Sequence, residues 1–174
     1  MTGTEFRSAF HEHKDAVYRF AWRMTNSWGA AEDIVQETFL ALLRHPVRFD
    51  HARGKLRSFL LGVARNVALK RWREEHRWDA LDDDQFAADP VDPARGETAE
   101  IVGAAVASLP PLQREALVLA EYEGLSLEEI ARTVEAEVGT VKARLYRARE
   151  NLRRMLAPLK QANGRSLTSN GTTK

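Results

Sequence analysis

Apolar residues recur at helical spacing along almost the whole chain, and this periodicity limits the fold more than any other feature. In Thr4–Thr25 and Ala30–Arg44 they return every three or four residues, as they do on one face of a helix. The same spacing continues in Lys55–Arg77, where it leaves Leu61 outside the apolar face. It resumes in Ile101–Leu109 and predicts another helix over Leu112–Glu123. The chain shows no alternating apolar pattern, which is the usual sign of a half-buried β-strand. The sequence therefore predicts an all-α protein.

An acidic segment without helical periodicity separates the two helical parts of the chain. Residues Asp79–Glu97 contain Pro90 and Pro93, which is typical of a solvated, flexible linker. We therefore expect two small helical domains, over residues 1–78 and 98–157, joined by a flexible acidic linker over 79–97. Residues 158–174 are rich in Gly, Ser, Thr and Asn and predict a flexible tail.

Charge is strongly segregated along a chain whose formal net charge is only +1. Gly54–Trp78 and Glu137–Lys160 each hold seven basic and two acidic side chains, so each block carries +5. Asp79–Glu100, between them, holds eight acidic and one basic side chain and carries −7. Blocks of one sign usually reflect charged partners rather than the fold. The two basic blocks therefore indicate surfaces for charged partners.

Composition excludes several classes of protein. The chain has no cysteine, which excludes disulfides and cysteine-based zinc sites. It has no apolar run near the roughly 18 residues of a membrane span and no apolar leader, so we expect a cytoplasmic protein without membrane insertion. It also lacks a glycine-rich phosphate loop, a nucleophile elbow and a ligand cluster, so we expect no enzyme, metal or cofactor.

The stretch Leu127–Leu145 has the pattern of a helix-turn-helix. Ser126 and Glu129 are spaced to form a capping box before a short helix over Leu127–Val134. A turn then leads to a longer helix over Gly139–Leu156, which such motifs place in the major groove. The turn position that is often glycine is Glu135 here, where a positive φ would cost about 1 kcal/mol.

The final helix divides into an apolar face and an exposed face when its residues are placed at about 100° intervals. Ala143 and Tyr146 lie at the centre of the exposed face, and basic side chains lie on both of its flanks. This arrangement suits base edges at the centre and phosphates at the sides, although an ordinary solvated basic helix is the alternative. The predicted DNA-contacting residues are Thr140, Lys142, Ala143, Tyr146, Arg147 and Arg149.

Three stretches resemble one known family. Leu109–Arg149 resembles region 4 of sigma-70-type RNA polymerase sigma factors, and its GTVKARLYRAR portion is especially similar to the extracytoplasmic function (ECF) group. AEDIVQETFLALLR at Ala31–Arg44 resembles region 2.2, and Phe49–Arg73 resembles regions 2.3 and 2.4. The stretches occur in the family's order, and the resemblance covers about residues 5–157.

The resemblance implies a bacterial transcription initiation factor that binds core RNA polymerase, recognises −35 and −10 promoter elements, promotes melting and is controlled by an anti-sigma factor. It assigns the final helix to the −35 element and implies contacts with the polymerase β′ coiled coil and β flap. The residues implied for polymerase binding are Asp33, Gln36 and Glu37. Those implied for the −10 element are Arg65, Asn66, Lys70 and Arg73, and Lys70 stands where the family often has Asp.

Two alternatives remain open. A repressor or activator that uses only the helix-turn-helix would bind duplex DNA without polymerase, often as a dimer. Pull-down with core polymerase, followed by promoter-dependent transcription, separates the two classes.

The polar strip in Ala31–Arg44 also has the simpler interpretation of a solvated helix face. We expect the acidic residues Asp82–Asp84 to mimic nucleic acid inside the polymerase channel.

Overall fold

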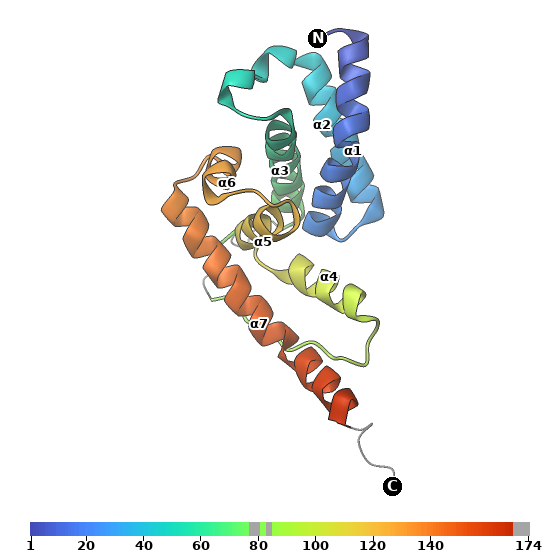
Figure 1. Ribbon diagram of the computed structural model, residues 1–174, viewed down its shortest axis with the longest axis vertical. Helices are drawn as coiled ribbons and strands as arrows, with labels where there is room; N and C mark the ends of the chain where they lie inside the picture. Colours follow the sequence, from blue (N-terminus) through green and yellow to red (C-terminus); the bar gives the residue numbers. More distant parts are fainter. Residues whose placement is uncertain (77–80, 83–84, 169–174) are drawn as a thin grey trace.

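The computed structural model describes residues 1–76, 81–82 and 85–168, with side chains placed up to Arg165. The regular elements of this part of the chain are all helices, which confirms the predicted all-α fold (Figure 1). Some residues of the predicted features lie outside the described residues, namely Arg77, Trp78, Asp79, Asp83, Asp84 and the tail residues 169–174.

The first half is a bundle of three helices, α1 (Gly3–Thr25), α2 (Trp28–Arg44) and α3 (Leu56–Glu75). Two short 3₁₀ turns, η1 (Pro46–Arg48) and η2 (His51–Arg53), connect α2 to α3. Side chains exposed by 1% or less fill the bundle, among them Val17, Phe20, Ile34, Leu42 and Leu60. Their burial accounts for the helical spacing of apolar residues in this half.

The second half holds, in order along the chain, α4 (Thr98–Ser108), α5 (Pro111–Leu117), the π-helical turn η3 (Val118–Tyr122), α6 (Leu127–Val134) and α7 (Val138–Thr168). The sequence predicted one helix over Leu112–Glu123, whereas the structure changes from α to π geometry at Val118. It also predicted that the last helix ends at Leu156, whereas α7 continues through Pro158 to Thr168. The residues that follow Leu156 include the helix formers Ala, Leu, Lys and Gln, which support this extension.

The two halves pack against each other and share one hydrophobic core. In Figure 1, α6 lies beside α3, and α5 lies between the three-helix bundle and the long α7. A Cβ added at Gly62 of α3 would lie 3.2 Å from the carbonyl oxygen of Thr133 in α6, so these two helices approach closely. Leu61, which the sequence placed away from the core face of α3, is fully buried. The sequence-based interpretation was wrong here because it considered only one packed face of α3.

Short α5 is buried even at its polar positions. Gln113, Arg114 and Glu115 are each exposed by 7% or less. The Arg114 guanidinium donates hydrogen bonds to the carbonyl oxygens of Met24 and Leu109, with Nη2 2.7 Å from the latter. Burial lowers the pKa of Arg114 to about 10. Arg114 therefore links the end of α1 to the second half through backbone carbonyls.

The acidic segment between the halves lies against the helices in its described part. Leu81, Phe86 and Val91 are half-buried and pack against the core, although the sequence predicted a solvated linker. The Val91 amide donates to the Met155 carbonyl at 2.9 Å, and the Leu112 amide donates to the Leu81 carbonyl at 3.1 Å. The apolar residues interspersed among the acidic ones explain this docking.

Candidate nucleic-acid interface

The helix-turn-helix forms as the sequence predicted. Ser126 and Glu129 make the capping box: the Ser126 amide donates to the Glu129 carboxylate at 2.8 Å, and the Glu129 amide donates to the Ser126 hydroxyl at 3.2 Å. These bonds satisfy amide groups that the first turn of α6 would otherwise leave unpaired. The two helices meet through side chains that are all buried, namely Ile130, Ala131, Val134, Val141, Leu145 and Ala148.

The turn between α6 and α7 has the strained geometry that its sequence suggested. Glu135 adopts φ 54° and ψ 49°, in the left-handed region. Its amide and that of Ala136 both donate to the Ala131 carbonyl, the latter at 3.0 Å. A positive φ at this residue is therefore confirmed, and the turn ends α6 so that α7 can leave in a new direction.

The exposed face of α7 presents the residues predicted for its centre. Thr140, Lys142, Ala143 and Tyr146 are all exposed, and Tyr146 is 67% exposed. Tyr146 therefore projects its phenol ring from α7 into solvent. The face therefore combines a hydroxyl, a methyl group and a phenol with one ammonium group.

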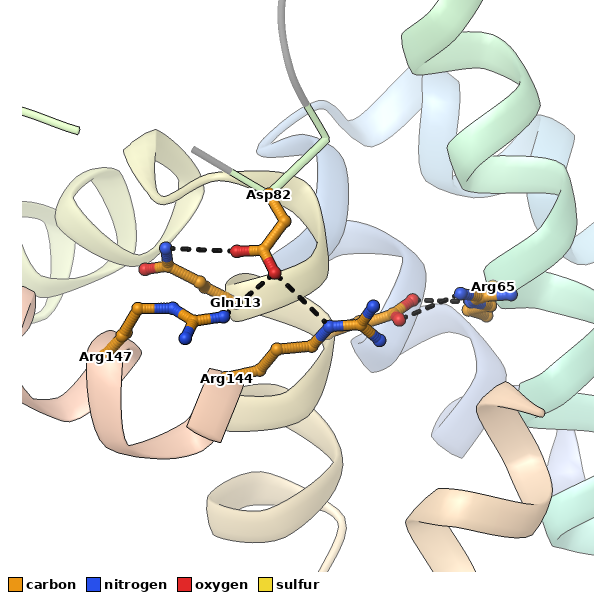
Figure 2. A network of polar contacts seen from close by, with 6 residues as sticks. Arg65, Asp82, Gln113, Arg144 and Arg147 are labelled. Atoms are coloured by element: carbon orange, nitrogen blue, oxygen red, sulfur yellow. Dashed lines mark hydrogen bonds and ion pairs between the residues drawn. The ribbon is translucent and has the colours of Figure 1, made fainter. Parts of the chain in front are cut away.

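The arginines beside that face are engaged within the chain. Arg147 Nη2 lies 2.9 Å from Asp82 Oδ2, and Arg144 Nε lies 3.5 Å from the same oxygen (Figure 2). Arg149 Nε lies 2.9 Å from Glu121 Oε1 at the end of η3. Of the predicted DNA contacts, Arg147 and Arg149 thus already have carboxylate partners.

On α3, as on α7, some of the predicted DNA contacts are exposed and others are already paired within the chain. Arg65 is bound to Glu115 of α5 by two hydrogen bonds, from Nε at 2.6 Å and from Nη2 at 3.0 Å. Asn66, Lys70 and Arg73 are exposed. The sequence grouped Arg65 with these three, but the packing of the second half turns Arg65 inward toward α5.

The Glu115 carboxyl is a buried charge at the junction of the two halves. It is 1% exposed, and burial raises its pKa above the ordinary value. The positive charges of Arg65, Arg144 and Arg73 act in the opposite direction but offset only part of this effect. The junction therefore holds a carboxylate whose ionisation is costly and depends on its arginine partners.

The acidic face of α2 is open. Asp33, Gln36 and Glu37 are exposed, and their spacing of three and four residues places them together on one side of the helix. The Asp33 carboxylate lies 3.5 Å from Arg71 Nη1 of α3. This ion pair places Asp33 beside α3, while Gln36 and Glu37 face solvent.

Sequence reasoning missed three residues that organise this interface, namely Gln113, Glu115 and Asn151. With Asp82, for which the sequence predicted a role in the polymerase channel, they lie in one polar network at the junction of the linker, α5 and α7. Figure 2 shows Asp82 and Gln113 in this network. The Asn151 amide donates to Gln113 Oε1 at 2.8 Å, and both side chains are buried. The only sequence signal was the polar run Gln113, Arg114 and Glu115 inside an otherwise apolar helix.

The described part of the chain holds neither a metal site nor a membrane-spanning helix. No group of three or more His, Asp or Glu side chains there is placed to hold a metal ion. Likewise, among the described helices none is both long and apolar enough to cross a membrane.

Known proteins match both halves of the chain. Residues 9–78 match the family model Sigma-70 region 2, and residues 99–152 match Sigma-70, region 4. The chain is 37% identical over 154 residues to the ECF RNA polymerase sigma factor SigE of Mycolicibacterium smegmatis, a match that covers 84% of this chain and 59% of that protein's length. It is 31% identical over 157 residues to the ECF RNA polymerase sigma factor SigK of Mycobacterium tuberculosis, with 84% and 83% covered.

The fold is also similar to that of a solved structure, the sigma factor RpoE in complex with the anti-sigma factor NepR from Bartonella quintana. The TM-score is 0.70 at 25% sequence identity, with 88% of this chain and 97% of that chain covered. Two region matches in the family's order, together with a relative above 30% identity across most of both chains, establish the relationship. The chain therefore belongs to the sigma-70 family of RNA polymerase sigma factors, in its extracytoplasmic function group.

Proposed function

We propose that this chain is a bacterial transcription initiation factor that joins core RNA polymerase, reads −35 and −10 promoter elements and promotes promoter melting. The observation that carries the proposal is the exposed face of α7, where Ala143 and Tyr146 stand beside Lys142 on a well-formed helix-turn-helix. Membership in the sigma-70 family supplies the polymerase partner. In this role the chain guides polymerase and is not itself an enzyme.

At the −35 element, α7 enters the major groove. Ala143 and Tyr146 meet base edges, and the Thr140 hydroxyl donates to a phosphate beside the start of the helix. Lys142, Arg147 and Arg149 bind backbone phosphates on the two sides of the groove. Because Arg147 and Arg149 have carboxylate partners in the free chain, they exchange those partners for phosphates on binding.

At the −10 element, the exposed part of α3 captures unpaired bases. Asn66 has both a donor and an acceptor for a base edge, and Lys70 and Arg73 follow the single-strand backbone. Arg65 belongs to this set only after its ion pair with Glu115 opens. Melting costs stacking energy, which the captured bases and backbone contacts offset.

The polymerase contacts involve both halves of the chain. Asp33, Gln36 and Glu37 on the open face of α2 bind the β′ coiled coil, and the region 4 half binds the β flap. The functional units are residues 1–78 as region 2, 79–97 as the linker, 98–157 as region 4 and 158–174 as the tail. The chain works in the cytoplasm, where polymerase is found.

Control by an anti-sigma factor is part of the proposal. The solved sigma factor RpoE is in complex with the anti-sigma factor NepR, and its fold covers 88% of this chain at a TM-score of 0.70. A partner that covers the open face of α2 and the exposed face of α7 would block both polymerase and promoter.

Run-off transcription with core polymerase on a genomic library tests the function and reveals the promoter sequence. Arg147→Ala should weaken −35-dependent transcription and leave core binding intact, because a phosphate contact is lost. Asp33→Ala combined with Glu37→Ala should weaken core binding and leave duplex binding intact. Equal loss of core binding in both variants would contradict this division of roles, and absence of any promoter-dependent transcript would refute the function.

A further inference from the structure

A polar network joins the linker to both DNA-facing helices (Figure 2). The Asp82 carboxylate contacts Arg147 at 2.9 Å and Arg144 at 3.5 Å through Oδ2, and Gln113 Nε2 lies 3.5 Å from Oδ1. Asp82 thus joins the acidic segment to α7 at the side chains of two arginines, in addition to the backbone bond between Val91 and Met155. The Leu112 amide bonded to the Leu81 carbonyl holds the adjacent backbone in place.

The groups around Asp82 form a site suited to an anion. Two guanidinium groups and one amide converge on one carboxylate, and the same donors bind phosphate oxygens equally well. The Arg144 side chain is only 16% exposed and the Arg147 side chain is 32% exposed, so these groups are partly shielded from water. Gln113 is fully buried and held by Asn151, which fixes the amide that faces the anion.

This anion site adjoins the face proposed to read the −35 element. Arg147 lies on the flank of that face, whereas Arg144 lies closer to the buried side of α7, with its side chain 16% exposed, and reaches Asp82 from there. DNA in the major groove would place backbone phosphates at this flank. A carboxylate held there occupies the position that a phosphate would take and adds a negative charge that repels the duplex.

We propose that Arg144, Arg147 and Gln113 form a binding site for a DNA backbone phosphate, and that Asp82 occupies it in the free chain as an intramolecular competitor. This proposal rests on the proposed function, since it takes α7 to be the DNA-binding helix. It adds Arg144 and Gln113 to the interface and gives the linker a regulatory role. Promoter binding then requires Asp82 to leave the site.

The network also connects Asp82 electrostatically to Arg65 of α3. Arg144 contributes to the electrostatic environment of Glu115, which in turn holds Arg65 of α3. The carboxylates and guanidinium groups therefore alternate from the linker through α7 and α5 to α3. When a phosphate replaces Asp82, the charge balance at Arg144 is kept, so the exchange needs no buried charge to be left uncompensated.

The test is duplex affinity measured by fluorescence anisotropy at fixed ionic strength. A fluorescein-labelled duplex of random sequence is sufficient, because phosphate contacts are independent of sequence. We expect Asp82→Asn to bind about fivefold more tightly than wild type, the factor associated with one partly exposed ion pair. Asp89→Asn is the matched control, since Asp89 is exposed in the same segment and the variant makes the same change in net charge.

A second variant tests the site itself. Asp82→Asn combined with Arg144→Gln should lose the gain in affinity, because the phosphate then lacks one of its two guanidinium partners. Equal affinity for Asp82→Asn and Asp89→Asn would overturn the proposal and leave the proposed function intact if run-off transcription persists. Retention of the gain in the double variant would also overturn it. Absence of both duplex binding and transcription would refute the proposed function and this inference together.

Linker release can be observed without changing Asp82. The chain has no cysteine, so Ala87→Cys, at an exposed position, gives a unique site for an environment-sensitive dye. Adding the unlabelled duplex should change the dye emission over the same concentration range as DNA binding. Constant emission while DNA binds would show that the segment stays docked and would overturn the proposal.

Discussion

The strained turn of the helix-turn-helix offers the sharpest test of the backbone argument. Glu135 holds φ 54° and ψ 49°, a conformation that glycine adopts without steric cost. Its side chain is exposed, so Glu135→Gly changes the turn without opening a cavity. We therefore expect this substitution to stabilise the protein.

The magnitude follows from two opposing effects. The left-handed conformation costs an L-residue about 1–2 kcal/mol. Glycine has more freedom in the unfolded chain, which reduces stability by about 0.4–1 kcal/mol. The net increase in the free energy of unfolding is therefore about 0–1.6 kcal/mol, and its midpoint of about 0.8 kcal/mol is equivalent to a rise in Tm of about 2–3 °C for a chain of this length.

Urea denaturation followed by circular dichroism would measure this change, with two controls. Glu135→Gln removes the charge but keeps the strain, so its stability should equal that of wild type. Asn26→Gly replaces a residue at φ 51° that tolerates the left-handed region, so its gain should be smaller. If Glu135→Gly is no more stable than wild type, or if Glu135→Gln gains as much, the left-handed conformation of Glu135 does not strain the protein.

The remaining predictions concern the junction between the halves. Leu61→Ala should lower the free energy of unfolding by about 2–5 kcal/mol, because it opens a cavity at a fully buried position. Leu43→Ala, at a 51% exposed position, is the control and should change the free energy of unfolding by less than about 0.5 kcal/mol. Equal effects of the two substitutions in denaturation experiments would contradict the burial of Leu61. Because the native pKa of Glu115 is raised, the native state holds this proton more tightly than the unfolded chain, and stability falls as pH rises from about 4.5 through the native pKa. The stability of wild type relative to Glu115→Gln should therefore decrease over this pH range, and a constant difference would refute the pKa argument.

Local sequence was sufficient to locate most of the helices of this protein, although not the π-helical turn at Val118 or the end of α7. Apolar spacing predicted the all-α fold, and the pair Ser126 and Glu129 marked the start of α6. Glu135 was identified as the residue under strain because a tight turn has few backbone solutions. Such features depend on interactions within a few residues, so the sequence carries them directly.

Surface exposure on isolated helices was also largely predictable. The open positions of Thr140, Lys142, Ala143 and Tyr146 followed from a helical wheel, since the buried side of α7 is set by its own apolar residues. Prediction failed where a helix packs on two sides. Leu61 is fully buried in α3, which contacts α6 of the second half as well as α1 and α2, and the local pattern of α3 does not indicate that additional contact.

The sequence determined by itself which helices form, where the helix-turn-helix lies and which residues its open face presents. Only the tertiary structure decided which charges meet. Arg147 and Asp82 are separated by 65 residues, and Arg65 and Glu115 by 50, yet each pair forms close hydrogen bonds. Helix formation is governed by neighbours three and four residues away, whereas the pairing of a buried carboxylate depends on which surfaces the folded chain brings together.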